Sequence, residues 1–151
     1  MAVHDVAPAA ELFRDVLGAE FLMGGNNTEQ AFRWVQYRFP GGGKIELVTP
    51  LGEGFVSRFL NKRGEGVHHL TFKAGNLPEQ VTRLRSGGVE PVQVSLDDPH
   101  WREAFIHPRQ AHGVLIQIAE SFHEDEEVSR RHLEHGLTEA VLLGAEATPG
   151  A

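Results

Sequence analysis

The stretch Gly66–Phe72, Gly-Val-His-His-Leu-Thr-Phe, sets the pattern for the rest of the chain. Val67, Leu70 and Phe72 are apolar residues that favour β-structure, and a glycine-rich break precedes them, which predicts a short buried strand. Successive side chains of a strand point to opposite faces, so only one of the two adjacent histidines can face a given cavity. A strand histidine is also common as a plain packing residue, so the pair needs support from elsewhere in the chain.

That support is a second copy of the same frame. An expected order of strand, helix and three strands over the first 48 residues returns after residue 66. Asp5-Val6 corresponds to Asn76-Leu77, and Lys44–Leu47 corresponds to Leu115–Ile118, both at an offset of 71 residues. Asp5 and Asn76 are each predicted to cap the helix that follows. A common offset across a whole unit is the mark of an internal repeat.

Other elements follow from local signals. A strand is expected over Ala19–Met23, with a turn at Gly24–Asn27, because Gly and Asn are typical turn residues. Residues outside the repeat predict one helix over Glu124–Val141, since apolar positions recur there at near-helical spacing. The small residues of 144–151 predict a flexible tail.

Composition narrows the function classes. The net charge of −7 argues against nucleic acid and anionic membranes as partners, which proteins bind chiefly through Lys and Arg. The absence of cysteine excludes disulfides, thiolate metal sites and thiol nucleophiles. No segment is apolar over the roughly 20 residues that a membrane helix needs. We therefore expect a cytoplasmic protein with a small-molecule partner.

The repeat makes Glu46 and Gln117 equivalent residues on the last strands of the two modules. Both alternate with apolar neighbours, and burying an unpaired carboxylate or amide costs a few kcal/mol. Binding of a metal or a substrate would explain polar residues there. The equivalent of His69 falls ahead of Met1.

Six short stretches within residues 1–120 carry a family resemblance. They are Val3–Val6, Leu12–Gly18, Lys44–Leu51, Gly64–Leu70, Phe105–Pro108 and His112–Leu115. Together they resemble the vicinal oxygen chelate superfamily, which includes glyoxalases, extradiol dioxygenases, bleomycin-resistance proteins and methylmalonyl-CoA epimerases. Within it, the resemblance to the epimerases is greatest.

The resemblance implies an α+β fold of two paired βαβββ modules that form a curved mixed sheet around a central cavity, plus a C-terminal helix. Residues 1–120 form a single domain in this scheme, with module one at 1–50, a linking helix at 51–63 and module two at 64–120. A C-terminal helix at 121–143 and the tail come after it. Members of this size commonly form homodimers, and we expect the same here.

The family also implies a divalent metal held by residues of both modules. Carried over, its ligands are Glu46, His69 and Gln117, with a first-strand histidine placed before Met1. His4 cannot replace that histidine, because six residues of strand displace it by roughly 20 Å. This ligand set would bind Co²⁺, Mn²⁺, Zn²⁺ or Ni²⁺. Because it lacks one histidine and includes an amide oxygen, it predicts weak binding or loss of the metal.

In the epimerases, such a metal stabilises the enolate that forms when a proton leaves the carbon α to a thioester carbonyl. Two glutamates serve as bases there, and their positions here hold Trp34 and Gln117. Glu46 is therefore the candidate catalytic base or metal ligand. Trp34, Trp101 and His107 are the candidate substrate-binding residues, and an acyl-CoA is the expected substrate class.

Two function classes stay open. The first is a metal-dependent enzyme acting next to a carbonyl, either an epimerase or a glyoxalase-like lyase. The second is a metal-free binding protein of the bleomycin-resistance type, which the missing histidine and glutamate favour. An extradiol dioxygenase is disfavoured, because its iron needs two histidines and a carboxylate.

Overall fold

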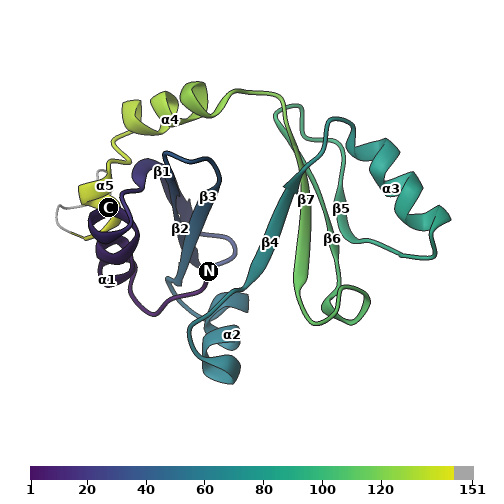
Figure 1. The fold of residues 1–151 in the computed structure, drawn as a ribbon, viewed down its shortest axis with the longest axis horizontal. Coiled ribbons are helices and arrows are strands. Elements are labelled where there is room, and N and C mark those ends of the chain that lie inside the picture. The colour runs from purple at the N-terminus through teal and green to yellow at the C-terminus, as the bar shows by residue number, and fades with distance from the viewer. Residues whose placement is uncertain (145–151) are drawn as a thin grey trace. The chain divides into compact units, whose positions relative to one another are not determined.

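A computed structural model describes residues 1–144 as two compact units (Figure 1). The first unit contains Met1–Gly66 and the segment that begins at Asp125, and the second contains Val67–Glu124. The expected tail at 144–151 lies, apart from Gly144, outside the described residues.

The first unit combines helices with one antiparallel sheet. Its strands are β1 (Glu20–Asn27), β2 (Phe32–Arg38) and β3 (Lys44–Pro50), paired in the order β1-β2-β3. Its helices are α1 (Val6–Ala10), the π-helical turn η1 (Glu11–Val16), α2 (Phe55–Arg63), α4 (Asp125–Glu134) and α5 (Glu139–Leu142). Ala2 adds a single parallel bridge to Val48 beside β3.

Local capping sets the first helix, as the sequence predicts. The Asp5 side chain accepts a hydrogen bond from the Ala7 amide at 3.0 Å, which satisfies one of the unpaired amides at the helix start. Gly18 ends the helical segment with a φ of 74°, a left-handed conformation that glycine adopts without strain.

The predicted turn at Gly24–Asn27 is wrong, because these residues belong to β1. Gly24 pairs with Val35 and Gly25 pairs with Trp34. A Cβ at Gly24 would lie 2.6 Å from both the Trp34 carbonyl oxygen and Leu142 Cδ1. This glycine therefore permits a close approach of packed elements, and the turn lies over residues 28–31 instead.

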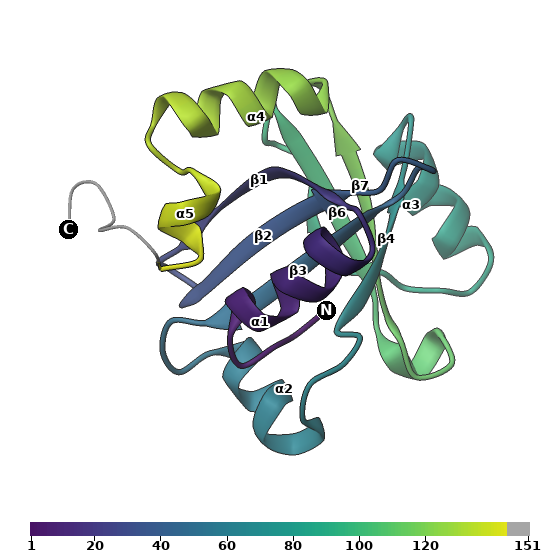
Figure 2. The ribbon, with the colours of Figure 1, turned by 60° about the vertical axis from the view of Figure 1, so that its left-hand side comes forward.

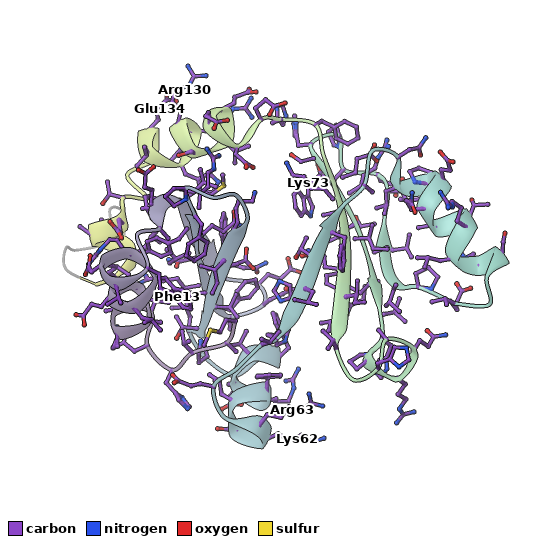
Figure 3. The ribbon with its side chains drawn as sticks, viewed as in Figure 1. Phe13, Lys62, Arg63, Lys73, Arg130 and Glu134 are labelled. Atoms are coloured by element: carbon purple, nitrogen blue, oxygen red, sulfur yellow. The ribbon has the colours of Figure 1, made fainter. Side chains whose placement is uncertain are left out.

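One face of this sheet forms the main core of the unit. Figure 2 shows α1 lying over β1-β2-β3. Val35, Tyr37 and Leu47 are fully buried on this face, and Phe13 packs against them from η1 (Figure 3). A smaller cluster joins Val48 to the buried face of α2.

The structure divides the single helix expected over Glu124–Val141 into α4 and α5. Gly136 has a φ of 75° after α4, and Thr138 then caps α5 by accepting from the Val141 amide at 3.3 Å. The break lets the chain turn inward, so that Leu142 is fully buried in the main core.

The second unit carries a four-stranded mixed sheet in the order β4-β7-β6-β5. Its elements are β4 (His69–Lys73), α3 (Leu77–Ser86), β5 (Val92–Ser95), β6 (Trp101–Ile106), the short 3₁₀ turn η2 (Pro108–Gln110) and β7 (Leu115–Ser121). β4 pairs with β7 in parallel, and the other pairs are antiparallel. α3 and β7 each begin 71 residues after α1 and β3, as the repeat predicts.

Helix α3 covers one face of this sheet: Leu77 and Val81 of the helix pack against Ala104 of β6 and Ile118 of β7. β4 was predicted as a buried strand, and this is wrong for its apolar residues, since Leu70 is 46% and Phe72 56% exposed. The reason is that β4 is an edge strand and α3 packs mainly on β6 and β7. None of the described helices is long and apolar enough to cross a membrane.

Candidate functional site

In the first unit, the face opposite α1 holds the candidate base, Glu46. Glu46 is paired with Gln36 across β3 and β2, so their side chains share a face. Gln36 Nε2 donates a hydrogen bond of 2.7 Å to Glu46 Oε2. This contact holds a half-buried carboxylate in one orientation.

Trp34 lies on the same face as Gln36, two residues along β2, and forms the wall of a hollow. The rings of Trp34 and His132 meet edge to face with centroids 5.4 Å apart. His132 Nδ1 lies 2.7 Å from the Gly24 carbonyl oxygen, which fixes α4 beside β1. The hollow has a volume of about 430 Å³ and is lined by Gly25, Asn26, Asn27, Thr28, Glu29, Trp34, His132 and Leu137. The sequence analysis missed His132, because it lies in a segment outside the repeat.

In the second unit, the face of the sheet opposite α3 carries His69 and Gln117. Thr71 on β4 pairs with Gln117 on β7, and His69 lies two residues before Thr71 on the same face. Thr71 Oγ1 donates a hydrogen bond of 2.7 Å to Gln117 Oε1. The structure thus brings these two predicted ligands to one face of one unit, whereas Glu46 belongs to the other unit.

This face also holds a carboxylate that the sequence analysis missed, Glu103 on β6. Gln117 Nε2 donates to Glu103 Oε2 at 2.7 Å, and Trp101 Nε1 donates to the same oxygen at 2.9 Å. Thr71, Gln117, Glu103 and Trp101 therefore form one hydrogen-bonded chain across three strands. The available signal was the alternation Trp101-x-Glu103-x-Phe105, which puts a carboxylate between two aromatic residues on one face.

The remaining candidate, His107, has a local role in the structure. It comes directly after β6, and its Nδ1 accepts a hydrogen bond of 3.2 Å from the Arg109 amide at the start of η2. Trp101 is held at the other end of β6. There the backbone amides of His100 and Trp101 donate to Asp98, and these bonds hold the pKa of that carboxyl below its ordinary value.

His68 was expected to face away from His69, and this is wrong. The two Nδ1 atoms lie 3.0 Å apart. The alternation rule does not apply to this pair, because β4 begins at His69 and His68 lies outside it.

A metal needs more donors than either unit supplies alone. Among residues 1–144, no three His, Asp or Glu side chains lie together as a metal site. His69 offers a nitrogen and Gln117 an amide oxygen that already accepts a hydrogen bond. Protein sites for Zn²⁺ and similar ions use at least three protein ligands. The donors within each unit therefore do not complete a metal site.

Comparison with known proteins gives the family. Residues 1–105 match the model of the glyoxalase/bleomycin resistance protein/dioxygenase superfamily. The uncharacterised Bacillus subtilis protein YqjC is 32% identical over 123 residues, which cover 80% of this chain and 87% of that protein. The mitochondrial methylmalonyl-CoA epimerase of Mus musculus is 30% identical over 129 residues, covering 80% of this chain and 70% of that protein.

A solved structure agrees with these relatives. Methylmalonyl-CoA epimerase from Mycobacterium tuberculosis superposes with a TM-score of 0.72 at 35% identity, covering 80% of this chain and 83% of that one. The fold and these sequence matches define a protein of the glyoxalase class. The chain belongs to the glyoxalase/bleomycin resistance/dioxygenase superfamily, also called the vicinal oxygen chelate superfamily.

Proposed function

We propose that this protein is an epimerase or isomerase acting at the carbon α to a carbonyl, in the manner of a methylmalonyl-CoA epimerase. The observation that carries the proposal is the half-buried Glu46 carboxylate, held by Gln36 on the open face of the first sheet. Similarity to two methylmalonyl-CoA epimerases over about 80% of this chain supports the substrate class.

Glu46 is the proposed base. A carboxylate removes the proton from the α carbon, and the electron pair of the broken C–H bond passes to the thioester carbonyl oxygen as an enolate. Return of a proton to the opposite face of that carbon inverts its configuration. Gln36 keeps the carboxylate oriented, so the side chain loses less rotational freedom when substrate binds.

The proposed cofactor is a divalent ion, Co²⁺, Mn²⁺, Zn²⁺ or Ni²⁺, with His69, Gln117 and Glu46 as its ligands. When bound, such an ion supplies Lewis-acid stabilisation of an enolate oxygen. Trp34, Trp101 and His107 are the proposed substrate contacts. We also propose the two-module division at 1–50 and 64–120, a homodimer and a cytoplasmic location, all from the family resemblance.

The test is solvent exchange at the α carbon. Each C2 epimer of methylmalonyl-CoA is incubated with protein and divalent metal in D₂O, and deuterium at C2 is followed by mass spectrometry against an enzyme-free control. We expect enzyme-dependent exchange in wild type, and Glu46→Gln should lower by about 10²–10⁴-fold the exchange of the epimer whose C2 proton Glu46 removes. Glu53→Gln changes an exposed carboxylate of the same unit and should leave the rate unchanged. Exchange no faster than in the enzyme-free control would contradict the proposal.

A metal-free binding protein is the second candidate. It is favoured by the Gln117 amide, whose oxygen and nitrogen are both hydrogen-bonded within the second sheet. Tight acyl-CoA binding by calorimetry with no exchange and no bound metal would support it. A glyoxalase-like lyase would instead turn over the hemithioacetal of methylglyoxal and glutathione.

A further inference from the structure

The second sheet carries a carboxylate one strand away from the position that the family resemblance indicates. That position, on β7, holds Gln117, which cannot take up a proton. The neighbouring strand β6 holds Glu103, and the two side chains are hydrogen-bonded. A role for Glu103 in the same reaction rests on the proposed function.

Register explains how the two side chains meet. Gln117 pairs with Phe105, and Glu103 pairs with Ala119, across the antiparallel strands β6 and β7. Glu103 and Gln117 are thus diagonal neighbours on one face, a spacing that long side chains can bridge. Glu103 Oε2 lies 2.7 Å from Gln117 Nε2, so the Glu103 carboxylate is in direct contact with the side chain at the position that the family resemblance indicates.

The contacts of Glu103 leave one oxygen available for chemistry. Gln117 Nε2 and Trp101 Nε1 both donate to Oε2, and these two bonds fix the direction of the carboxylate. Oε1 makes no hydrogen bond to any residue that the structure describes. The Glu103 side chain is half-buried rather than fully exposed to solvent. A carboxylate positioned by one oxygen, with the other open to a ligand, suits proton transfer.

We propose that Glu103 is a second proton-transferring residue of this protein, acting on the α carbon of a malonyl-type thioester. Its Oε1 takes the C2 proton as the C–H bond breaks, and the electron pair becomes the enolate; the reverse step returns the proton to carbon. No oxidant or further reactant is needed. Epimerisation requires two such groups, and Glu103 is proposed as the second, in addition to the proposed base Glu46.

The decisive variant is Glu103→Gln. Its amide oxygen can still accept from Trp101 and Gln117, so we expect the thermal unfolding midpoint to stay within a few degrees. Epimerisation of methylmalonyl-CoA should fall by about 10²–10⁴-fold. Deuterium uptake from D₂O should be lost from one C2 epimer only, because Glu46 still exchanges the other. Glu46→Gln should show the opposite stereochemical preference.

Two further variants complete the design. Glu90→Gln removes an exposed carboxylate of the same unit, paired with Arg85, and should leave both exchange rates unchanged. Glu103→Gln combined with Gln117→Glu exchanges the amide and the carboxylate while keeping a donor and an acceptor between the strands. This double variant should recover at least tenfold in epimerisation over Glu103→Gln, and it carries the test if the single variant does not fold.

The outcomes separate the two proposals. Wild-type protein that exchanges both epimers, with Glu103→Gln equal to it or reduced equally for both, overturns the role of Glu103 alone. Wild-type protein that exchanges neither epimer overturns the proposed function and this role with it. Loss confined to one epimer, with recovery in the double variant, supports the assignment.

Discussion

The hydroxyl of Tyr37 donates a hydrogen bond of 2.7 Å to Glu139 Oε1, which joins β2 to α5. Arg14 Nη1 donates to the same carboxylate oxygen at 3.0 Å. Tyr37 is fully buried, and burial, followed by the bond to Glu139, raises the pKa of its phenol above the ordinary value. The C-terminal segment is thus tied to the main core by a buried polar contact.

This contact predicts a loss of stability in alkali. Because the folded-state pKa of Tyr37 is raised, its contribution is fully present below the unfolded-state pKa of about 10 and is lost as the pH rises through the folded-state value. Tyr37→Phe should lower the free energy of unfolding by about 1–3 kcal/mol at neutral pH and flatten its decline above pH 10. Urea unfolding at a series of pH values measures both effects.

The sequence contains one tyrosine, so absorbance titration of the phenolate reports Tyr37 alone. Ionisation of the native protein at the ordinary pKa would contradict the buried contact. Glu139→Gln keeps an acceptor for the hydroxyl and should retain part of the stability that Tyr37→Phe loses.

Leu142 should be a major anchor of the C-terminal segment. It is fully buried in the main core of the first unit with Val35 and Leu47. Leu142→Ala leaves a cavity there and should lower the free energy of unfolding by about 2–5 kcal/mol. Leu133→Ala removes the same atoms from a side chain that is 47% exposed on α4, and a change of similar size there would contradict the prediction.

Gly24 should resist any side chain. An added Cβ would lie 2.6 Å from the Trp34 carbonyl oxygen, which is backbone and cannot rotate away. Gly24→Ala should therefore cost about 1–3 kcal/mol, measured as a lower urea midpoint. At Gly41 nothing lies within 4 Å of an added Cβ, so Gly41→Ala should change stability by less than about 0.5 kcal/mol. Equal effects at the two glycines would disprove the packing argument.

Local and periodic signals predicted most of the fold. The caps Asp5 and Asn76 act as expected, with Asn76 accepting from the Glu79 amide at 3.1 Å. The offset of 71 residues holds for β3 with β7. The turn predicted at Gly24–Asn27 failed because glycine serves both turns and close packing, and composition alone does not distinguish them. The break at Gly136 was missed because the apolar spacing continues on both sides of it.

The site was predicted less completely. The repeat and the family resemblance indicated Glu46 and Gln117, and whether these residues act as proposed is for experiment. Glu103 was not predicted, because its contact with Gln117 depends on the pairing of β6 with β7, and the sequence of one strand does not reveal that pairing. A carboxylate on an exposed strand face usually indicates only a solvated surface. Its meaning here comes from the hydrogen bonds of Gln117 and Trp101.

His69 should decide metal binding, because it is the only nitrogen donor among the proposed ligands. Protein prepared without chelator or nickel resin and incubated with Co²⁺ or Mn²⁺ should hold about one equivalent of the ion by elemental analysis, and His69→Ala should lose most of it. His112→Asn is the matched control: this exposed histidine has a φ of 55°, which Asn tolerates, and its replacement should leave the metal content unchanged.

Equal metal in His69→Ala and wild type would remove His69 from the ligand set. Wild-type protein that stays free of metal after incubation with Co²⁺ or Mn²⁺ would favour the metal-free binding protein instead, because a ligand set able to serve the proposed reaction should capture at least one of these ions.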